Sequence, residues 1–481
     1  MGIEDKLGVE YGYSVLTSPG IAKNYKAIGP KKVKFSDVCW GDIQVIGPIT
    51  LFGKTYRSYN WSKLDAAVKD WQTAGFDIQM VLRSKCSWGT APTVSIPSGI
   101  LFPDAASAPP TSKYYSEYLE WLKQAILRYS GIGGSKTMPG LIRPIRFWEI
   151  ESEQGSPMFW MGTDEDYIRL LAAANFTIKV TDPNAKIILG GLNFSNGLND
   201  DPSDAIIEQR LSAIAEPIQT MLRNGVAQFY KLLDRPDLFD IIEFHNLLEY
   251  TSIPYVIKRI NSETQKRGYT KEVWVGDANS APQVQPSQTD LIPLDPYAVK
   301  MGQVLFMGTN YPGYPQALAW LRAEQARLAI KKYTYALAFG ASRIYMGLME
   351  DWPWYTGYPY NGLTESNGSP RPVWNAIQSY AQRITGFDSI TEVSLGGYTI
   401  SAVTLPTFDI CLYRLTSGDR TIYIGWTEPG NITIQMPFVG TQASIWTVPT
   451  TLAEGGGLTT TIPVVSNTLT LKLTTTPIII S

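Results

Sequence analysis

Three carboxylates recur at alternate positions in the short segment 148–155, which reads WEIESEQG. They belong to Glu149, Glu151 and Glu153. Alternate residues of a β-strand point to the same face, so the pattern predicts three acidic side chains side by side. Like charges packed this closely disfavour one another's ionisation and are costly to bury. Carboxylates placed at such a cost are candidates for acid, base or nucleophilic chemistry that needs no cofactor.

Other reactive residue types are scarce, which narrows the chemistry. His245 is the single histidine, and the three cysteines, Cys39, Cys86 and Cys411, have no zinc-type spacing. A His-rich metal site is therefore excluded, and a Ser-His or Cys-His mechanism would have only this one histidine to use. We expect neither a metal nor a cofactor.

Alternating strand and helix patterns must position these residues. Eight strand-then-helix units span about residues 9–382; within them the amphipathic helix of residues 62–75 leads into the strand of residues 76–88. This order is the pattern of a parallel (β/α)8 barrel. The alternative is a doubly wound sheet, which commonly carries a Gly-rich phosphate turn after its first strand. Residues 14–24 (SVLTSPGIAKN) do not match that turn.

From about residue 386 the hydrophobic period changes to two, in short segments separated by turn residues. That pattern predicts an all-β sandwich. The predicted domains are a catalytic (β/α)8 barrel, residues 1–385, and a β-sandwich accessory domain, residues 386–481, with a structural or sugar-binding role. A long insertion, residues 281–320, is expected either to wall the cleft or to be an ordered structural loop.

Charge and hydropathy exclude several kinds of partner. The 41 basic and 43 acidic residues leave a formal charge of −2, so we expect no nucleic acid partner. No apolar run approaches the roughly 20 residues of a membrane span, and the first residues lack the apolar region of a signal peptide. Asn-x-Ser/Thr sequons would permit N-glycosylation in a secretory setting. An extracellular location is favoured, an intracellular one stays open, and the oligomeric state is not predicted.

In a (β/α)8 barrel the chemistry takes place where the strands end at the carboxyl face. Predicted strands four, six and seven end at Glu153, His245 and Asp277, and the eighth ends at Glu350 and Asp351. Two carboxylates facing one another across a cleft can protonate a glycosidic oxygen and attack or stabilise the anomeric carbon. The 14 Trp, 27 Tyr and 16 Phe residues also offer ring faces for sugars. We therefore predict a carbohydrate substrate.

A family resemblance supports this chemistry. Residues 146–192 (RFWEIESEQGSPMFWMGTDEDYIRLLAAANFTIKVTDPNAKIILGGL) resemble the clan A glycoside hydrolases, and most of all the family 39 group of β-xylosidases and α-iduronidases. Such enzymes show W-E-x-W-N-E-P-N, then F-W and a helix. Segments 59–92, 239–246 and 360–384 support the resemblance, which covers most of the barrel and the terminal sandwich. It implies hydrolysis of O-glycosidic bonds in a xylan-like or β-glucan-like poly- or oligosaccharide.

The resemblance also implies roles for individual residues. Glu153 matches the general acid/base, and Asp277 falls where relatives end strand seven with the nucleophile, a glutamate. His245 matches a histidine that arranges the nucleophile side of the pocket, and Glu149 matches a buried acid. Ser152 stands where relatives have an Asn that binds the sugar's 2-hydroxyl. The resemblance favours retention. Aspartate is shorter than glutamate by roughly 1.5 Å, which widens the gap between the two carboxyl groups, so inversion with Asp277 as base stays open.

Further residues are candidates with a structural alternative. Glu243 is the reserve catalytic carboxylate, or else an interior acid bonded to His245 or a neighbouring strand. Five tryptophans beyond predicted strand ends are candidate sugar platforms or else core residues: Trp40, Trp88, Trp160, Trp352 and Trp354. The departures at Ser152 and Asp277 leave a second hypothesis, a catalytically silent barrel that acts as a carbohydrate-binding or interaction module.

Overall fold

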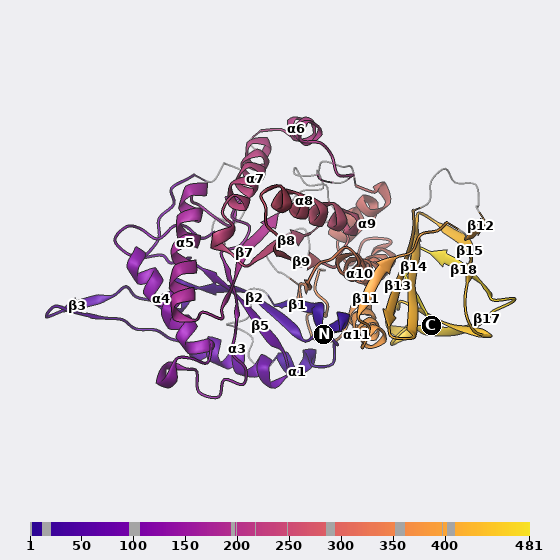
Figure 1. Ribbon diagram of the computed structural model, residues 1–481, viewed down its shortest axis with the longest axis horizontal. Helices are drawn as coiled ribbons and strands as arrows, with labels where there is room; N and C mark the ends of the chain where they lie inside the picture. Colours follow the sequence, from indigo (N-terminus) through magenta and orange to yellow (C-terminus); the bar gives the residue numbers. More distant parts are fainter. Residues whose placement is uncertain are drawn as a thin grey trace.

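The structure is a computed structural model. It describes residues 2–11, 21–95, 106–193, 198, 200–216, 218–247, 249–284, 294–351, 361–396, 398–401 and 409–481. Figure 1 shows a barrel flanked by a smaller all-β part, which lies at the right of the view and contains the C-terminus.

Eight parallel strands close into a barrel in the order β1-β10-β9-β8-β7-β6-β5-β2. Their bounds are β1 (Leu7–Tyr11), β2 (Lys32–Cys39), β5 (Asp77–Arg83), β6 (Phe147–Ile150), β7 (Lys186–Asn193), β8 (Ile241–Asn246), β9 (Glu272–Asn279) and β10 (Arg343–Gly347). The predicted (β/α)8 fold is confirmed. Strands such as β1 and β8 are buried along their whole length, because helices cover the outside of the barrel and side chains fill the inside.

The helices surround this barrel (Figure 1). They are α1 (Ala22–Tyr25), α2 (Trp40–Ile43), α3 (Ser62–Thr73), α4 (Tyr115–Tyr129), α5 (Asp164–Thr181), α6 (Asp204–Ser212), α7 (Ile218–Leu233), α8 (Ile253–Lys266), α9 (Pro296–Phe306), α10 (Tyr314–Ala338) and α11 (Pro372–Ile384). Short 3₁₀ helices lie at Ile3–Lys6, Gly134–Lys136, Pro236–Leu238, Tyr250–Ser252 and Leu452–Glu454. Within the insertion 281–320, α9 and the start of α10 share a small hydrophobic cluster, so its described part is ordered helical structure.

The inside of the barrel has two layers of different character. The lower layer is an apolar cluster that contains Ile188, Ile241, Trp274 and Tyr345. Nearer the carboxyl ends of the strands, the interior positions are polar and charged, with Lys34, Gln79, Glu149 and Glu243 at most 1% exposed. The strands therefore carry a charged cluster on top of an apolar base.

Two antiparallel sheets follow the barrel and confirm the predicted sandwich. One has the order β11-β13-β14-β19-β16-β17 and the other β12-β15-β18. The strands are β11 (Ser389–Glu392), β12 (Thr399–Ser401), β13 (Asp409–Ser417), β14 (Arg420–Glu428), β15 (Asn431–Pro437), β16 (Gln442–Thr447), β17 (Leu458–Pro463), β18 (Thr468–Thr474) and β19 (Ile478–Ile480). The predicted boundary at residues 385/386 lies between α11 and β11.

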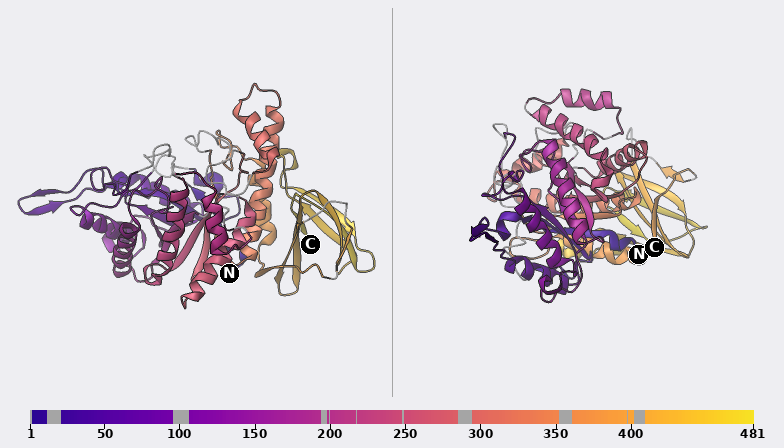
Figure 2. Two further views of the ribbon diagram at one scale, coloured as in Figure 1. Left: turned by 90° about the horizontal axis from the view of Figure 1, so that it is seen from above. Right: turned by 60° about the vertical axis from the view of Figure 1, so that its left-hand side comes forward.

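The sandwich and the barrel share one hydrophobic core. Tyr335 on α10 packs its ring against Tyr413 and Trp426 of the larger sheet, with centroids 5.7 and 5.6 Å apart. Lys331 on the same helix pairs with Glu428. The sandwich is thus packed firmly against α10, on the side of the barrel away from the α3 to α5 helices (Figures 1 and 2).

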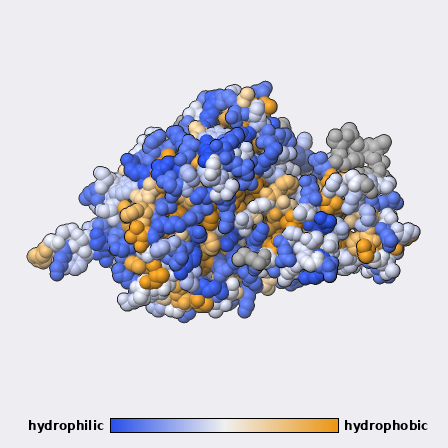
Figure 3. All heavy atoms as spheres, viewed as in Figure 1, coloured by the Kyte–Doolittle hydropathy of each residue, from blue (hydrophilic) through white to orange (hydrophobic). Residues whose placement is uncertain are grey.

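A hairpin of β3 (Ile49–Leu51) and β4 (Lys54–Tyr56) projects from the opposite end of the molecule (Figures 1 and 2). Its turn residue Phe52 is fully exposed, and apolar surface is visible at the tip in Figure 3. The hairpin packs little against the barrel and contributes few core contacts.

Trp426 provides a test of the shared core. Trp426→Ala should lower the free energy of unfolding by about 3–5 kcal/mol, because it removes a fully buried indole. Phe52→Ala, at the hairpin tip, is the control and should change it by less than about 0.5 kcal/mol. Urea denaturation of both variants measures the difference, and equal stabilities would contradict the packing.

Candidate active site

The carboxyl ends of four neighbouring strands bring the predicted catalytic residues into one region. In the sheet register Asn193 of β7 lies beside His245 of β8, which lies beside Asp277 of β9. Glu153 follows β6 and reaches two of them: its Oε1 is 2.7 Å from His245 Nδ1, and its Oε2 accepts a hydrogen bond of 3.1 Å from Asn193 Nδ2. Glu153 and His245 are only 4% and 5% exposed.

The backbone after β6 departs from the predicted strand. Glu151 and Glu153 have φ angles of 58° and 45°, in the left-handed region that costs non-glycine residues about 1–3 kcal/mol each. The prediction that three glutamates share one face is therefore wrong beyond Ile150, where β6 ends. Glu151 instead accepts a hydrogen bond of 2.6 Å from the Ser84 backbone N–H, which leaves Glu149 in the interior and Glu153 above it.

A buried ammonium group lies beneath Glu153 and His245. Lys34 Nζ is 3.0 Å from Glu149 Oε2 and forms an ion pair with Glu243. Gln79 Nε2 donates to both carboxylates, at 2.9 and 2.8 Å. This cluster holds one cation between two acids, so a positive charge already occupies the position where Glu149, Glu243 and His245 come close enough together to hold a metal ion.

The charges of this cluster set its protonation states. Burial and the nearby Glu243 charge raise the pKa of Glu149 to about 7, although Lys34 opposes them. Burial also favours a neutral Glu243, but Lys34 and His245 outweigh it and lower that pKa to about 2. Glu243 is thus a buried, ionised partner of Lys34, whose strand β2 is not a neighbour of β8 in the barrel.

His245 is held as an imidazolium. Burial and Lys34 would lower its pKa, but the hydrogen bond to Glu153 and the interaction with Glu243 raise it to about 10. Its ring packs over Gly191, where a Cβ atom would lie 1.9 Å from Nε2, so only glycine leaves room for it. The sequence resemblance placed His245 on the nucleophile side, whereas its short contact is to Glu153.

Sequence reasoning missed two residues that contact the predicted pair. Asn193 donates a hydrogen bond to Glu153, and the carboxyl group of Glu10 on β1 lies with that of Asp277 over Gly347. Glu10 was visible as a charged residue in an otherwise apolar barrel strand, GVEYG, and that is a signal for an interior polar group.

The predicted sugar platforms separate into three groups. Trp40 and Trp160 are 0% and 1% exposed, so their rings are core and present no face to a sugar, which corrects the substrate-binding role predicted for them. Trp88 is half-buried and packs edge-on against Trp40, with centroids 4.7 Å apart. Ser152 is also half-buried. The predictions for residues 352 and 354, both tryptophans, lie outside the described residues.

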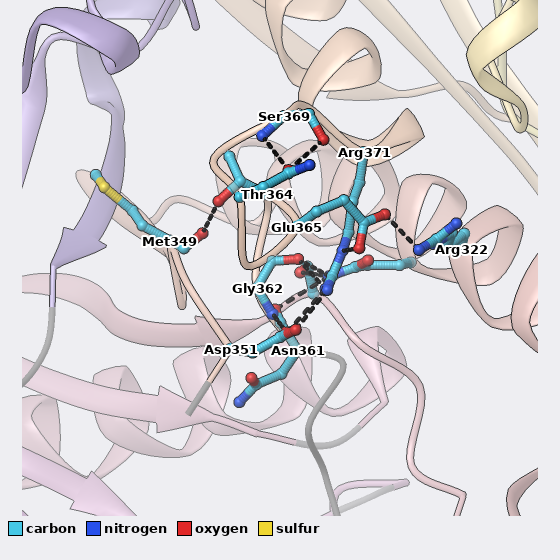
Figure 4. A network of polar contacts seen from close by, with 12 residues as sticks. Arg322, Met349, Asp351, Asn361, Gly362, Thr364, Glu365, Ser369 and Arg371 are labelled. Atoms are coloured by element: carbon cyan, nitrogen blue, oxygen red, sulfur yellow. Dashed lines mark hydrogen bonds and ion pairs between the residues drawn. The ribbon is translucent and has the colours of Figure 1, made fainter. Parts of the chain in front are cut away.

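Asp351, a predicted strand-end carboxylate, has a structural role (Figure 4). Arg371 donates to both of its oxygens, at 2.9 and 2.5 Å, and the Gly362 N–H donates at 2.8 Å. Glu365 bridges Arg371 and Arg322 nearby. The network ties Asp351 to Gly362 and Arg371, so this carboxylate has a structural role.

Comparisons with known proteins agree on the fold. No protein-family model matches the chain, and no curated protein matches it. Among solved structures, a family 39 glycoside hydrolase from Bacteroides cellulosilyticus WH2 is similar with a TM-score of 0.56 at 16% identity, covering 99% of this chain and 81% of that one. A monomeric β-xylosidase from Caulobacter crescentus CB15 has a TM-score of 0.56 at 13% identity, covering 100% and 96%.

A family 30 endoxylanase from Clostridium papyrosolvens C71 is similar with a TM-score of 0.55 at 12% identity, covering 99% of this chain and 95% of that one. The chain therefore shares its fold with these glycoside hydrolases, and the likeness to a family 39 structure agrees with the sequence resemblance. None of the described helices is long and apolar enough to cross a bilayer.

Lys34 provides a test of the buried cluster. Lys34→Met should lower the free energy of unfolding at pH 7 by about 3–5 kcal/mol, since it leaves two acids buried without their cation. The control Lys186→Met removes a side chain that is 54% exposed and should cost less than about 1 kcal/mol. Urea denaturation compares the two, and a K34M protein as stable as the control would contradict the ion-pair geometry.

His245 can be observed directly, because it is the only histidine. We expect ¹⁵N NMR of histidine-labelled protein to show an imidazolium at pH 8. Glu153→Gln should lower the pKa of His245, because it removes the negative charge beside the ring. The folded state keeps a proton that the unfolded chain releases near pH 6.5, so this group's contribution to stability declines as pH rises from about 6.5 towards 10. A neutral ring at pH 7 in the wild-type protein would refute the assignment.

Proposed function

We propose that the protein is a glycoside hydrolase that cleaves O-glycosidic bonds with Glu153 as general acid/base and Asp277 as nucleophile. The observation that carries the proposal is the buried Glu153 carboxylate, held between His245 and Asn193 at the carboxyl face of the barrel. His245 in turn lies beside Asp277 on the neighbouring strand. Active sites of (β/α)8 enzymes lie at this face.

The His245–Glu153 pair supplies the proton in this proposal. The imidazolium donates to Glu153 Oε1, so the pair holds one proton that can move to the carboxylate. Glu153 then protonates the glycosidic oxygen while Asp277 attacks the anomeric carbon. In the second step Glu153 accepts a proton from a water molecule whose oxygen attacks the anomeric carbon. The bond from that carbon to Asp277 breaks, which regenerates the Asp277 carboxylate and releases the sugar with retained configuration.

The substrate class is proposed from the solved structures of similar fold. They include a β-xylosidase, an endoxylanase and a bifunctional glucanase-xylanase. A xylan-like or β-glucan-like chain is therefore our proposal for this protein. The alternative, a silent sugar-binding barrel, is favoured by Ser152 and Asp277, which replace the Asn and Glu of apparent relatives.

Glu153→Gln tests the acid/base role. On the best substrate from a screen of polysaccharides and oligosaccharides, its kcat should fall by about 10²–10⁴-fold, because the leaving oxygen loses its proton donor. On an activated aryl glycoside, whose leaving group needs no proton, the loss in the first step should be far smaller. Full activity of E153Q on the natural substrate would sink the assignment.

Asp277→Asn should abolish turnover of both substrate types. The matched control is Glu263→Gln on α8, a buried acid paired with Lys266 and Arg267, which should leave kcat and KM unchanged. Saccharide binding by the wild-type protein without any product release would favour the silent barrel instead.

A further inference from the structure

A second carboxyl group lies near the proposed nucleophile. Glu10 comes from β1 and Asp277 from β9, which are separated in the barrel by β10. They meet over Gly347, the last residue of β10, which has no side chain to hold them apart. A Cβ atom at this position would lie 2.8 Å from Glu10 Oε2 and 3.1 Å from Asp277 Oδ1.

The surroundings of Glu10 assign its two oxygens different roles. Ser36 Oγ on β2 donates to Glu10 Oε1. Among the described residues, no N–H or O–H group donates to Oε2, the oxygen that lies over Gly347 together with Asp277 Oδ1. Glu10 is 5% exposed, so water does not take that place freely. Oε2 is therefore the oxygen that can carry a proton towards Asp277.

The charges around the pair favour one shared proton. Two neighbouring carboxylates cannot both ionise at low cost. Burial raises the pKa of Glu10 well above its usual range, and the neighbouring Asp277 raises it further, although Lys34 on β2 and His245 on β8 oppose both effects. The buried Lys332 on α10 is a further charged group near Asp277: burial lowers the pKa of Lys332, and the charge of Asp277 opposes that effect.

We propose that Glu10 is a positioning residue for Asp277: its protonated Oε2–H donates a hydrogen bond that fixes the orientation of the shorter aspartate. The inference rests on the proposed function and names a device by which it works. A neutral donor orients the carboxylate and leaves it ionised, which attack on the anomeric carbon requires. Fixing the orientation matters because small misplacements of a reacting group are costly.

The shared proton has a consequence for pH dependence. Below the raised pKa of Glu10 the carboxyl is neutral and donates to Asp277; above it, both groups are negative and repel. The rate on an activated aryl glycoside, whose departure does not need Glu153 as acid, should therefore fall on the alkaline side as Glu10 ionises.

Infrared difference spectroscopy tests the proton without any substrate. The spectrum of the wild-type protein minus that of Glu10→Gln at pH 7 should contain the C=O stretch of a protonated carboxyl group, and this band should disappear as pH is raised. A difference spectrum with only carboxylate bands would overturn the proposal, even in an active enzyme. If the band is present but no glycoside is turned over, the proposed function fails instead.

Kinetics on the activated aryl glycoside test the positioning. Glu10→Gln keeps a neutral donor, so its kcat should stay within about tenfold of the wild-type value and its alkaline limb should move up or vanish. Glu10→Ala removes the donor, so its kcat should fall by about 10²-fold with little change in KM. Glu263→Gln is again the control. An unchanged alkaline limb in E10Q, or full kcat in E10A, would overturn the proposal.

Discussion

The Lys34 ammonium group inside the barrel is the charge on which the rest of the site depends. It is 1% exposed and lies between the carboxylates of Glu149 and Glu243. Because Lys34 keeps Glu243 ionised, an anion remains below His245. That anion and Glu153 together hold His245 as an imidazolium. The charge buried on β2 thus acts on His245 in two opposite ways: directly it disfavours the imidazolium, and through the ionised Glu243 it supports it.

This arrangement divides the barrel by function. The apolar lower layer stabilises the closed sheet by burial. The charged layer above it gains little net stability, since desolvation of buried ion pairs offsets much of their attraction. Its benefit is orientation: Lys34 and Gln79 fix two acids, and these support the residues above them. The left-handed backbone conformation of Glu151 and Glu153 also destabilises the fold locally, beside the same charged layer.

The repeating pattern and the strand-end rule made the fold, Glu153 and His245 predictable from the sequence. Glu10 was not predictable, because its contact with Asp277 crosses β10 and exists only where Gly347 leaves space. The turn after Ile150 was missed as well, since three alternating glutamates read as one continuing strand. Trp40 and Trp160 are core residues because they are buried. Their position after a strand does not reveal this, since core residues and sugar platforms can both follow a strand.

In the proposed mechanism Asp277 attacks the anomeric carbon of the sugar, and Glu153 first donates and then accepts a proton. Trapping with a 2-fluoro glycoside that carries an activated leaving group tests it most directly, with intact-mass and peptide mass spectrometry as the readout. We predict one fluoroglycosyl group per chain, attached to the peptide that contains Asp277 and absent in Asp277→Asn. A label on Glu243 or Glu10, or turnover of the reagent without any covalent adduct, would contradict the account.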